Sequence, residues 1–104
     1  METKKQIIND MIFIQDLIKN NKEYIKLDIK KMYSMKQLSQ DEYRIFILRH
    51  GMSNDNKEHM FSELALKFEK SIEETLSIYK NALNKVRINI RQSLLNKNLI
   101  TFQT

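Results

Sequence analysis

The sequence contains no proline, no cysteine and no tryptophan, and its only glycine is Gly51. Proline and glycine punctuate the turns and hairpins of β proteins, so a chain with a single such residue offers little support for a sheet. Its many Leu, Ile, Lys, Gln and Glu residues instead sustain helices. At 104 residues the chain is long enough for one modest core. We therefore predict an all-α protein with a single domain of four to five helices.

The lack of cysteine excludes a disulfide framework and a thiolate metal site. A long apolar run is also lacking, because Asp10 and Asp16 interrupt the first amphipathic stretch. Neither a signal peptide nor a membrane-spanning helix is therefore expected. We predict a soluble cytoplasmic protein that has no membrane partner.

Residues suited to catalysis are few. The only histidines are His50, which we expect to compensate the dipole at a helix end, and His59 in a polar loop. The adjacent acids at 41–42 and 73–74 point about 100° apart on a helix, and they lie where helix capping explains them. A glycine-rich phosphate loop is absent, as is the order of Ser, His and Asp found in hydrolases. We expect no enzyme activity, no cofactor and no bound metal.

The net charge of +5 is concentrated at the two ends of the chain. Residues 1–37 carry eight Lys and five acids, residues 38–70 carry five basic and six acidic residues, and residues 71–104 carry five basic and two acidic residues. Basic ends suit a polyanionic partner, because each phosphate neutralised by Lys or Arg releases counterions. A solvated lysine-rich surface explains the same bias equally well.

Apolar residues recur with the helical period over the first 37 residues. They form two amphipathic segments, and their positions are Ile7, Ile8, Met11, Ile12, Ile18, Tyr24, Ile25, Ile29, Met32 and Tyr33. Asn20-Asn21 separates the segments, so this part is either two helices or one bent helix. We expect residues 1–37 to pack on the remaining domain or to extend it.

A helix start is predicted at Ser39. Its side chain would cap the helix, and Glu42, three residues later, would complete a capping box. This helix should span residues 40–50, and Gly51 supplies the left-handed conformation with which helices commonly end. Residues 52–59, rich in Ser, Asn and Asp, are predicted to form a loop.

A short helix is predicted next, over residues 60–68. Its apolar stripe consists of Phe61, Leu64, Ala65 and Phe68. Ser71 then begins a second capping-box pattern with Glu74, so the connection is only about three residues long. The last helix should run from there to residue 96. Its predicted apolar face consists of Ile72, Thr75, Leu76, Ile78, Tyr79, Ala82, Leu83, Val86 and Ile90. Its polar face consists of Glu73, Ser77, Lys80, Asn81, Asn84, Arg87 and Arg91.

A short helix, a tight turn and a longer helix with a polar outer face together predict a helix-turn-helix. The second helix of this motif lies in the major groove of DNA, which is wide enough to admit one helix. We predict DNA contacts from Ser71, Glu73, Glu74, Ser77, Lys80, Asn81, Asn84, Lys85, Arg87 and Arg91. Among these, the expected phosphate contacts are Lys85, Arg87 and Arg91. An antiparallel helix pair with one solvated side would have the same spacing.

The same stretch resembles region four of bacterial sigma factors, without a gap from residue 63 to residue 87. The matching positions are Leu38-Ser39-x-x-Glu42-x-x-Ile45-Phe46-x-Leu48-Arg49-x-Gly51-Met52, Phe61-x-Glu63-Leu64-Ala65-x-x-Phe68 and Ser71-x-Glu73-x-x-x-x-Ile78-x-x-x-Ala82-Leu83-x-Lys85-Val86-Arg87. In that family the domain binds the −35 promoter element through its second helix and docks on the flap of RNA polymerase. The resemblance therefore implies a DNA-binding transcription regulator. Its partners would be double-stranded DNA and either RNA polymerase or a sigma factor.

Several positions depart from the family. Basic residues often stand where this chain has Ile72, Glu74 and Leu76, and Gln is common at the position of Ser77. Glu73 matches a family residue that accepts a hydrogen bond from cytosine. Ile or Leu cannot replace the bidentate contact of Arg with guanine. We expect Ile72 and Leu76 to widen the core-facing stripe; the alternatives are that they contact thymine methyl groups or form a protein interface.

Sigma region two is rich in aromatic and basic residues that handle melted DNA. The first 37 residues show none of that strand-opening chemistry, so a complete sigma factor is not implied. We predict a small stand-alone regulator, of the type found in phages or mobile elements, with its helix-turn-helix domain over residues 38–91. The alternative is a protein-interaction module that binds RNA polymerase or a sigma factor without reading DNA sequence. A third interpretation is a homodimer formed through Ile88 together with the helix end and C-terminal tail, residues 92–104. The apolar residues for that contact are Ile88, Leu94, Leu95, Leu99 and Ile100.

Overall fold

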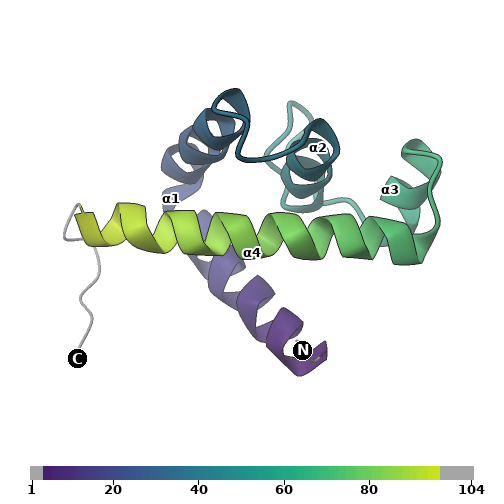
Figure 1. Ribbon diagram of the computed structural model, residues 1–104, viewed down its shortest axis with the longest axis horizontal. Coiled ribbons are helices and arrows are strands. Elements are labelled where there is room, and N and C mark those ends of the chain that lie inside the picture. The colour runs from purple at the N-terminus through teal and green to yellow at the C-terminus, as the bar shows by residue number, and fades with distance from the viewer. Residues whose placement is uncertain (1–3, 97–104) are drawn as a thin grey trace.

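A computed structural model describes residues 4–96 of the chain, and the side chains of residues 11–92. In this part of the chain the elements are α1 (Lys4–Ser34), α2 (Gln40–Arg49), α3 (Phe61–Lys67) and α4 (Ile72–Asn96). Helix α4 runs along the length of the molecule, α2 and α3 pack on one side of it, and α1 crosses it (Figure 1). The all-α prediction is confirmed, since the described residues form four helices and no strand. None of these helices is both long enough and apolar enough to cross a membrane.

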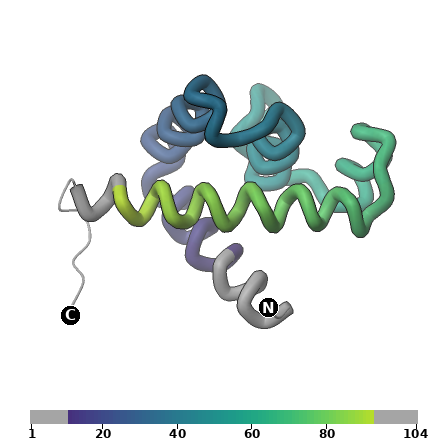
Figure 2. Tube along the Cα trace, viewed as in Figure 1, coloured from purple at the N-terminus to yellow at the C-terminus, as the bar shows by residue number. Residues whose placement is uncertain are grey.

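The first helix bends where the sequence places two asparagines. Helix α1 continues to Ser34, but Asn21 has non-helical angles (φ −137°, ψ 34°) that kink it. The Asn21 side-chain amide donates to the Leu17 carbonyl (3.2 Å), and that of Asn20 donates to the Asp16 carbonyl (3.3 Å). The two asparagine side chains thus provide hydrogen bonds to backbone carbonyls next to the interrupted turn. One bent helix is therefore the correct alternative, and Figure 2 shows its change of direction.

The core lies where α1, α2 and α3 meet α4. Its buried apolar side chains are Ile14, Ile18, Ile25, Ile29, Met32, Leu38, Ile45, Phe46, Ile47, Met52, Leu64, Ala65, Tyr79, Ala82, Leu83, Val86 and Ile90. Both halves of α1 contribute to this core, and α1 packs on α4 and α2. The predicted apolar face of α4 is confirmed at Thr75 and from Ile78 to Ile90, because its members there are buried or partly buried, whereas Leu76 is exposed.

Helix α2 begins and ends as the sequence predicts. The Ser39 hydroxyl accepts a hydrogen bond from the Glu42 N–H (3.1 Å), and the Glu42 carboxylate accepts one from the Ser39 N–H (2.8 Å). This exchange is the predicted capping box. At the other end Gly51 has φ 67°, and an added Cβ would lie 3.3 Å from the Glu58 side chain. Residues 52–60 then form an irregular loop.

Three helices end with the same backbone arrangement. The residues that follow α1, α2 and α3 in the left-handed conformation are Lys36 (φ 63°), Gly51 (φ 67°) and Glu69 (φ 55°). Beyond each of them, an N–H returns to a carbonyl of the last helical turn, as in a Schellman motif. These bonds run from Gln37 to Met32 (2.8 Å), from Met52 to Ile47 (2.9 Å) and from Lys70 to Ala65 (2.9 Å). Among these three left-handed residues only Gly51 is a glycine. The position of glycine in the sequence therefore predicted the end of α2 but not the ends of α1 and α3.

Candidate nucleic-acid interface

The α3–α4 pair forms one end of the molecule. Residues 68–71 connect the two helices, and Figure 1 shows this turn at the N-terminal end of α4. Leu64 and Ala65 of α3 are buried, so the apolar stripe of this helix packs inward as predicted. We call residues 68–77, which comprise the turn and the first turns of α4, the α3–α4 corner. The outer side of this corner points away from the core.

A second capping box fixes the start of α4. The Ser71 hydroxyl accepts from the Glu74 N–H (3.0 Å), and the Glu74 carboxylate accepts from the Ser71 N–H (3.1 Å). The Thr75 hydroxyl donates to the Ser71 carbonyl (2.9 Å). The bond from the Ser71 N–H holds the pKa of Glu74 below its ordinary value, so this carboxylate is charged near pH 7. The predicted box is confirmed, and it gives Ser71 and Glu74 a structural role.

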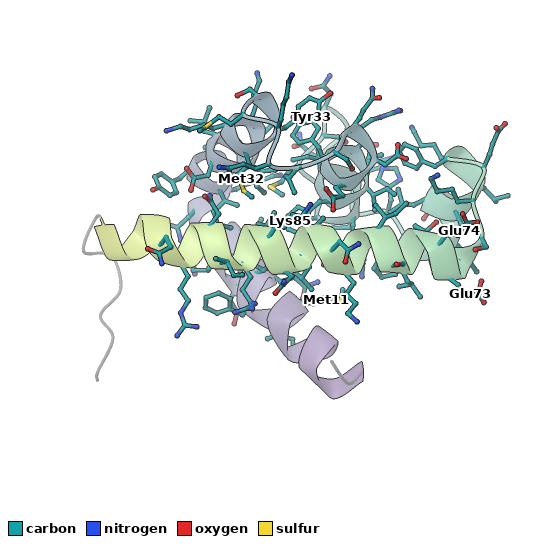
Figure 3. All side chains as sticks on the ribbon, viewed as in Figure 1. Met11, Met32, Tyr33, Glu73, Glu74 and Lys85 are labelled. Atoms are coloured by element: carbon teal, nitrogen blue, oxygen red, sulfur yellow. The ribbon has the colours of Figure 1, made fainter. Side chains whose placement is uncertain are left out.

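Beyond the box, α4 carries a strip of polar side chains on one side. Glu73, Ser77 and Asn81 are exposed, and Lys80 and Asn84 are half-buried. Neighbours at three-residue and four-residue spacing share one side of a helix, so we call these five residues the outer strip. Figure 3 shows Glu73 and Glu74 at the free end of α4, next to α3. The outer strip therefore begins at the extremity of the molecule.

Two apolar side chains of the corner are exposed rather than buried. Ile72 is 47% exposed and Leu76 is 41% exposed, whereas Tyr79 and Leu83 farther along the helix are buried. The first turns of α4 extend past the part of the helix on which α1 and α2 pack (Figure 1). The short helix α3 covers only the side that faces it. The expectation that Ile72 and Leu76 widen the core is therefore wrong.

An ion pair ties the middle of α4 to the start of α2. The Lys85 ammonium lies 3.0 Å from both carboxylate oxygens of Glu42. Burial raises the pKa of Glu42, but hydrogen bonds from the Ser39 backbone and from Lys85 outweigh burial, so the pKa lies below its ordinary value. Lys85, predicted to contact phosphate, is thus engaged within the fold. No local pattern predicted this pair, because 43 positions separate its members.

The two arginines predicted at phosphates differ in exposure. Arg87 is half-buried, and its guanidinium donates to the Asn84 side chain (3.0 Å), while its Nε atom is buried. Arg91 is exposed and is the more accessible of the two. Ile88, predicted to take part in dimerisation, is 51% exposed. The other residues of that prediction, which lie outside the described side chains, are Leu94, Leu95, Leu99 and Ile100.

A buried polar pair anchors the end of α2 on α4. His50 Nε2 lies 2.6 Å from the Tyr79 hydroxyl oxygen. The ring of Phe46 packs on His50, with 4.5 Å between centroids, and the edge of Phe61 meets Tyr79 at 5.0 Å. Burial lowers the pKa of His50 to about 3 and raises that of Tyr79, so both groups are neutral near pH 7. The expectation that His50 compensates the helix dipole is therefore wrong, because burial keeps the ring uncharged.

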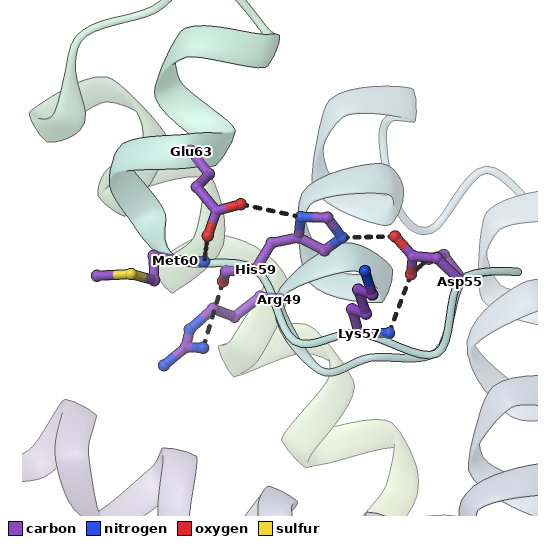
Figure 4. Close-up of polar contacts among 7 residues, drawn as sticks. Arg49, Asp55, Lys57, His59, Met60 and Glu63 are labelled. Atoms are coloured by element: carbon purple, nitrogen blue, oxygen red, sulfur yellow. Dashed lines mark hydrogen bonds and ion pairs between the residues drawn. The ribbon is translucent and has the colours of Figure 1, made fainter.

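A network around His59 holds the loop that precedes α3 (Figure 4). His59 Nε2 lies 2.9 Å from an Asp55 carboxylate oxygen, and Nδ1 lies 3.6 Å from one of Glu63. The Arg49 guanidinium donates to the His59 carbonyl (3.3 Å) and stacks on the Phe61 ring, 4.8 Å from its centroid. These contacts join α2, the loop and α3, and they fix the position of α3. No cluster of His, Asp and Glu in the described residues is arranged to hold a metal ion.

The predicted site residues fall into two groups. The outer strip and Arg91 lie on accessible or half-buried parts of α4, with Ile72 and Leu76 beside them. The hydrogen bonds and the ion pair described above engage Ser71, Glu74, Lys85 and Arg87, and also Asn84 of the outer strip. No protein-family model, no curated protein and no solved structure matches this chain.

Proposed function

We propose that this chain is a DNA-binding transcription regulator whose helix-turn-helix resembles region four of bacterial sigma factors. The observation that supports this function is the α3–α4 corner, where α4 builds the core with one side and carries the outer strip on the other. The major groove of B-DNA is about 12 Å wide and admits a helix about 10–12 Å in diameter. In the proposed complex, the first turns of α4 enter the groove and α3 lies across them.

The outer strip supplies polar groups that match base edges. The Glu73 carboxylate would accept a hydrogen bond from the amino group of cytosine, and the Asn81 amide would pair with the edge of adenine. Lys80, one turn beyond Ser77, would donate to guanine or to a phosphate. A single helix side thus offers both acceptors and donors to the groove.

The rest of α4 is suited to the phosphate backbone. After Glu74, residues 75–104 contain five Lys or Arg and no acid. Among the described residues of this segment, we assign the exposed Arg91 to a phosphate contact. Because neutralised phosphates release counterions, binding should weaken steeply as salt is added.

A salt titration of two charge-matched variants tests this function. Lys80→Gln removes one cation from the outer strip, and Lys57→Gln removes one from the loop before α3. The probe is a duplex that the wild-type protein selects from a random pool, and binding is followed by fluorescence anisotropy. We expect K80Q to weaken binding and to reduce the slope of log K against log salt by about 1. The slope of K57Q should match that of the wild-type protein.

One outcome would contradict DNA binding, and another would contradict the assignment of the contact to the outer strip. One is that the wild-type protein enriches no duplex from the random pool at low salt. The other is that K80Q and K57Q bind the selected duplex with the same affinity and salt slope as the wild-type protein. The second result would move the contact away from the outer strip.

A second candidate function is a protein-interaction module that binds RNA polymerase or a sigma factor without reading DNA. The acids at the start of α4 favour it, since Glu73 is exposed, Glu74 is charged, and neither attracts phosphate. Ile72 and Leu76 add exposed apolar surface beside them. Retention of RNA polymerase on the immobilised protein, combined with no enrichment of any duplex, would support this function over the first.

A further inference from the structure

The two exposed apolar side chains of the α3–α4 corner have no role in the core. Ile72 and Leu76 are 47% and 41% exposed, although Tyr79, Leu83 and Val86 farther along the same helix are buried. We infer that these two side chains recognise thymine, by contacting its 5-methyl group in the major groove. This inference rests on the proposed DNA binding, and it names the base chemistry that the site selects.

The start of α4 presents both side chains in a defined position. The hydrogen bonds between Ser71 and Glu74 fix the first turn of the helix. Ile72 is β-branched, and such side chains keep few rotamers on a helix. Leu76 follows one turn later on the same side. Little conformational freedom therefore remains to be lost when a ligand covers them.

Their spacing fits the stacking of base pairs. Two residues four positions apart are separated by about 6 Å along a helix axis. Successive bases of one DNA strand are about 3.4 Å apart, so this separation covers about two base-pair steps. The methyl group of thymine is the apolar group on the base edges of the major groove. Ile72 and Leu76 can thus meet the methyl groups of two base pairs that lie about two steps apart.

The polar side chains that border Ile72 and Leu76 match the chemistry of base edges. Ile72, Leu76 and Lys80 follow one another at four-residue steps, and each lies about 40° farther around the helix than the last. Glu73 and Ser77 border them on the outer side and are exposed. A protein interface concentrates apolar side chains at its centre and places charges at its rim. Here polar groups alternate with apolar ones within two turns, as do the methyl, amino and carbonyl groups of base edges.

Replacement of thymine by uracil tests the inference, because it removes only the methyl group. The probe is the duplex selected by the wild-type protein, synthesised with deoxyuridine at one thymine position at a time. We expect the dissociation constant to rise about fourfold at each contacted position, the value of one buried methyl group. Positions outside the contact should show no change.

Variants on α4 identify the side chains involved. In the double variant with Ile72→Ala and Leu76→Ala, the thymine and uracil duplexes should bind equally. Ile88→Ala is the matched control, because Ile88 is 51% exposed on the same helix and lies outside the corner. This control should keep the full difference between thymine and uracil. Thermal melting followed by circular dichroism establishes that each variant is folded.

Each of the following outcomes overturns the inference, and each identifies the step that fails. A selected site that lacks thymine, or equal binding of thymine and uracil duplexes by the wild-type protein, overturns thymine recognition and leaves DNA binding intact. Failure of every duplex to bind overturns the proposed function as well. If the double variant keeps its affinity and its sensitivity to uracil but no longer retains RNA polymerase, the two side chains contact a protein instead.

Discussion

The two capping boxes of this protein have the same pattern but opposite surroundings. Ser39 with Glu42, at the start of α2, and Ser71 with Glu74, at the start of α4, exchange the same pair of hydrogen bonds. Glu42 is buried and also pairs with Lys85, whereas Glu74 is exposed. A local motif therefore decides where a helix begins, but tertiary packing decides whether that start belongs to the core.

The same contrast runs along α4 itself. The middle of α4 buries Leu83 in the core and pairs Lys85 with Glu42 at the start of α2. The α3–α4 corner, in contrast, leaves Leu76 exposed. The middle of the molecule thus carries stability. The corner is left with side chains that can meet a ligand.

The largest expected effect compares one substitution at two places on α4. Leu83→Ala should lower the free energy of unfolding by about 3 kcal/mol, because it opens a cavity in the core. Leu76→Ala should change it by less than about 0.5 kcal/mol, because the side chain is already partly in water. Urea denaturation of both variants measures the difference. Equal losses would mean that the corner is packed as tightly as the middle.

Acid should weaken the middle of the molecule through His50. Burial lowers the pKa of His50 to about 3, from an ordinary value of 6.5. Between these values the unfolded chain binds a proton that the folded chain does not, so stability falls as the pH falls below 6.5. The free energy of unfolding should drop by about 2 kcal/mol from about pH 7 to about pH 5.

The two histidines provide a matched pair for that measurement. His50→Asn should remove this part of the pH dependence, since it leaves no ring to protonate at the buried site. His59→Asn, in the loop before α3, should preserve it. If the free energy of unfolding of H50N still falls steeply between about pH 7 and about pH 5, the proton binds to another group.

The smallest expected effect separates the two capping boxes. Glu42→Gln keeps a capping side chain but removes the charge that Lys85 pairs with, so it should cost about 1 kcal/mol near pH 7. Glu74→Gln has no comparable ion pair and should leave the melting temperature nearly unchanged. Because the pKa of Glu42 is lowered on folding, its contribution is present above the ordinary carboxylate range and is lost as the pH falls through the folded-state pKa. The wild-type protein and E42Q should therefore converge in acid, and a gap that persists there would point to lost packing instead.

The sequence predicts those parts of the fold that depend on neighbouring residues. Both capping boxes, the left-handed Gly51 and the extent of α4 follow from side chains within a few positions of one another. The bend of α1 was also signalled locally, by the pair of asparagines at its kink. In each case a short-range hydrogen bond or a glycine conformation supplies the cause.

Features that depend on distant residues were not predicted. The bond between His50 and Tyr79 spans 29 positions, and no periodic pattern reports on it. Lys36 and Glu69 adopt left-handed conformations that their side chains do not favour, because the helix ends on which they sit impose them. At the candidate site, the exposure of Ile72 was missed for a related reason. Helical periodicity gives the direction of a side chain, but not whether another element reaches far enough to cover it.

The length of the turn of residues 68–71 is as important for the corner as the side chains that it carries. Its backbone conformation, with Glu69 at φ 55°, sets how α4 leaves α3. Because the buried side of α4 fixes the rotation of that helix, inserting or deleting one residue in this turn would leave the outer strip in place. The change would instead shift α3 relative to the start of α4, while the core residues of α2 and α4 keep their places.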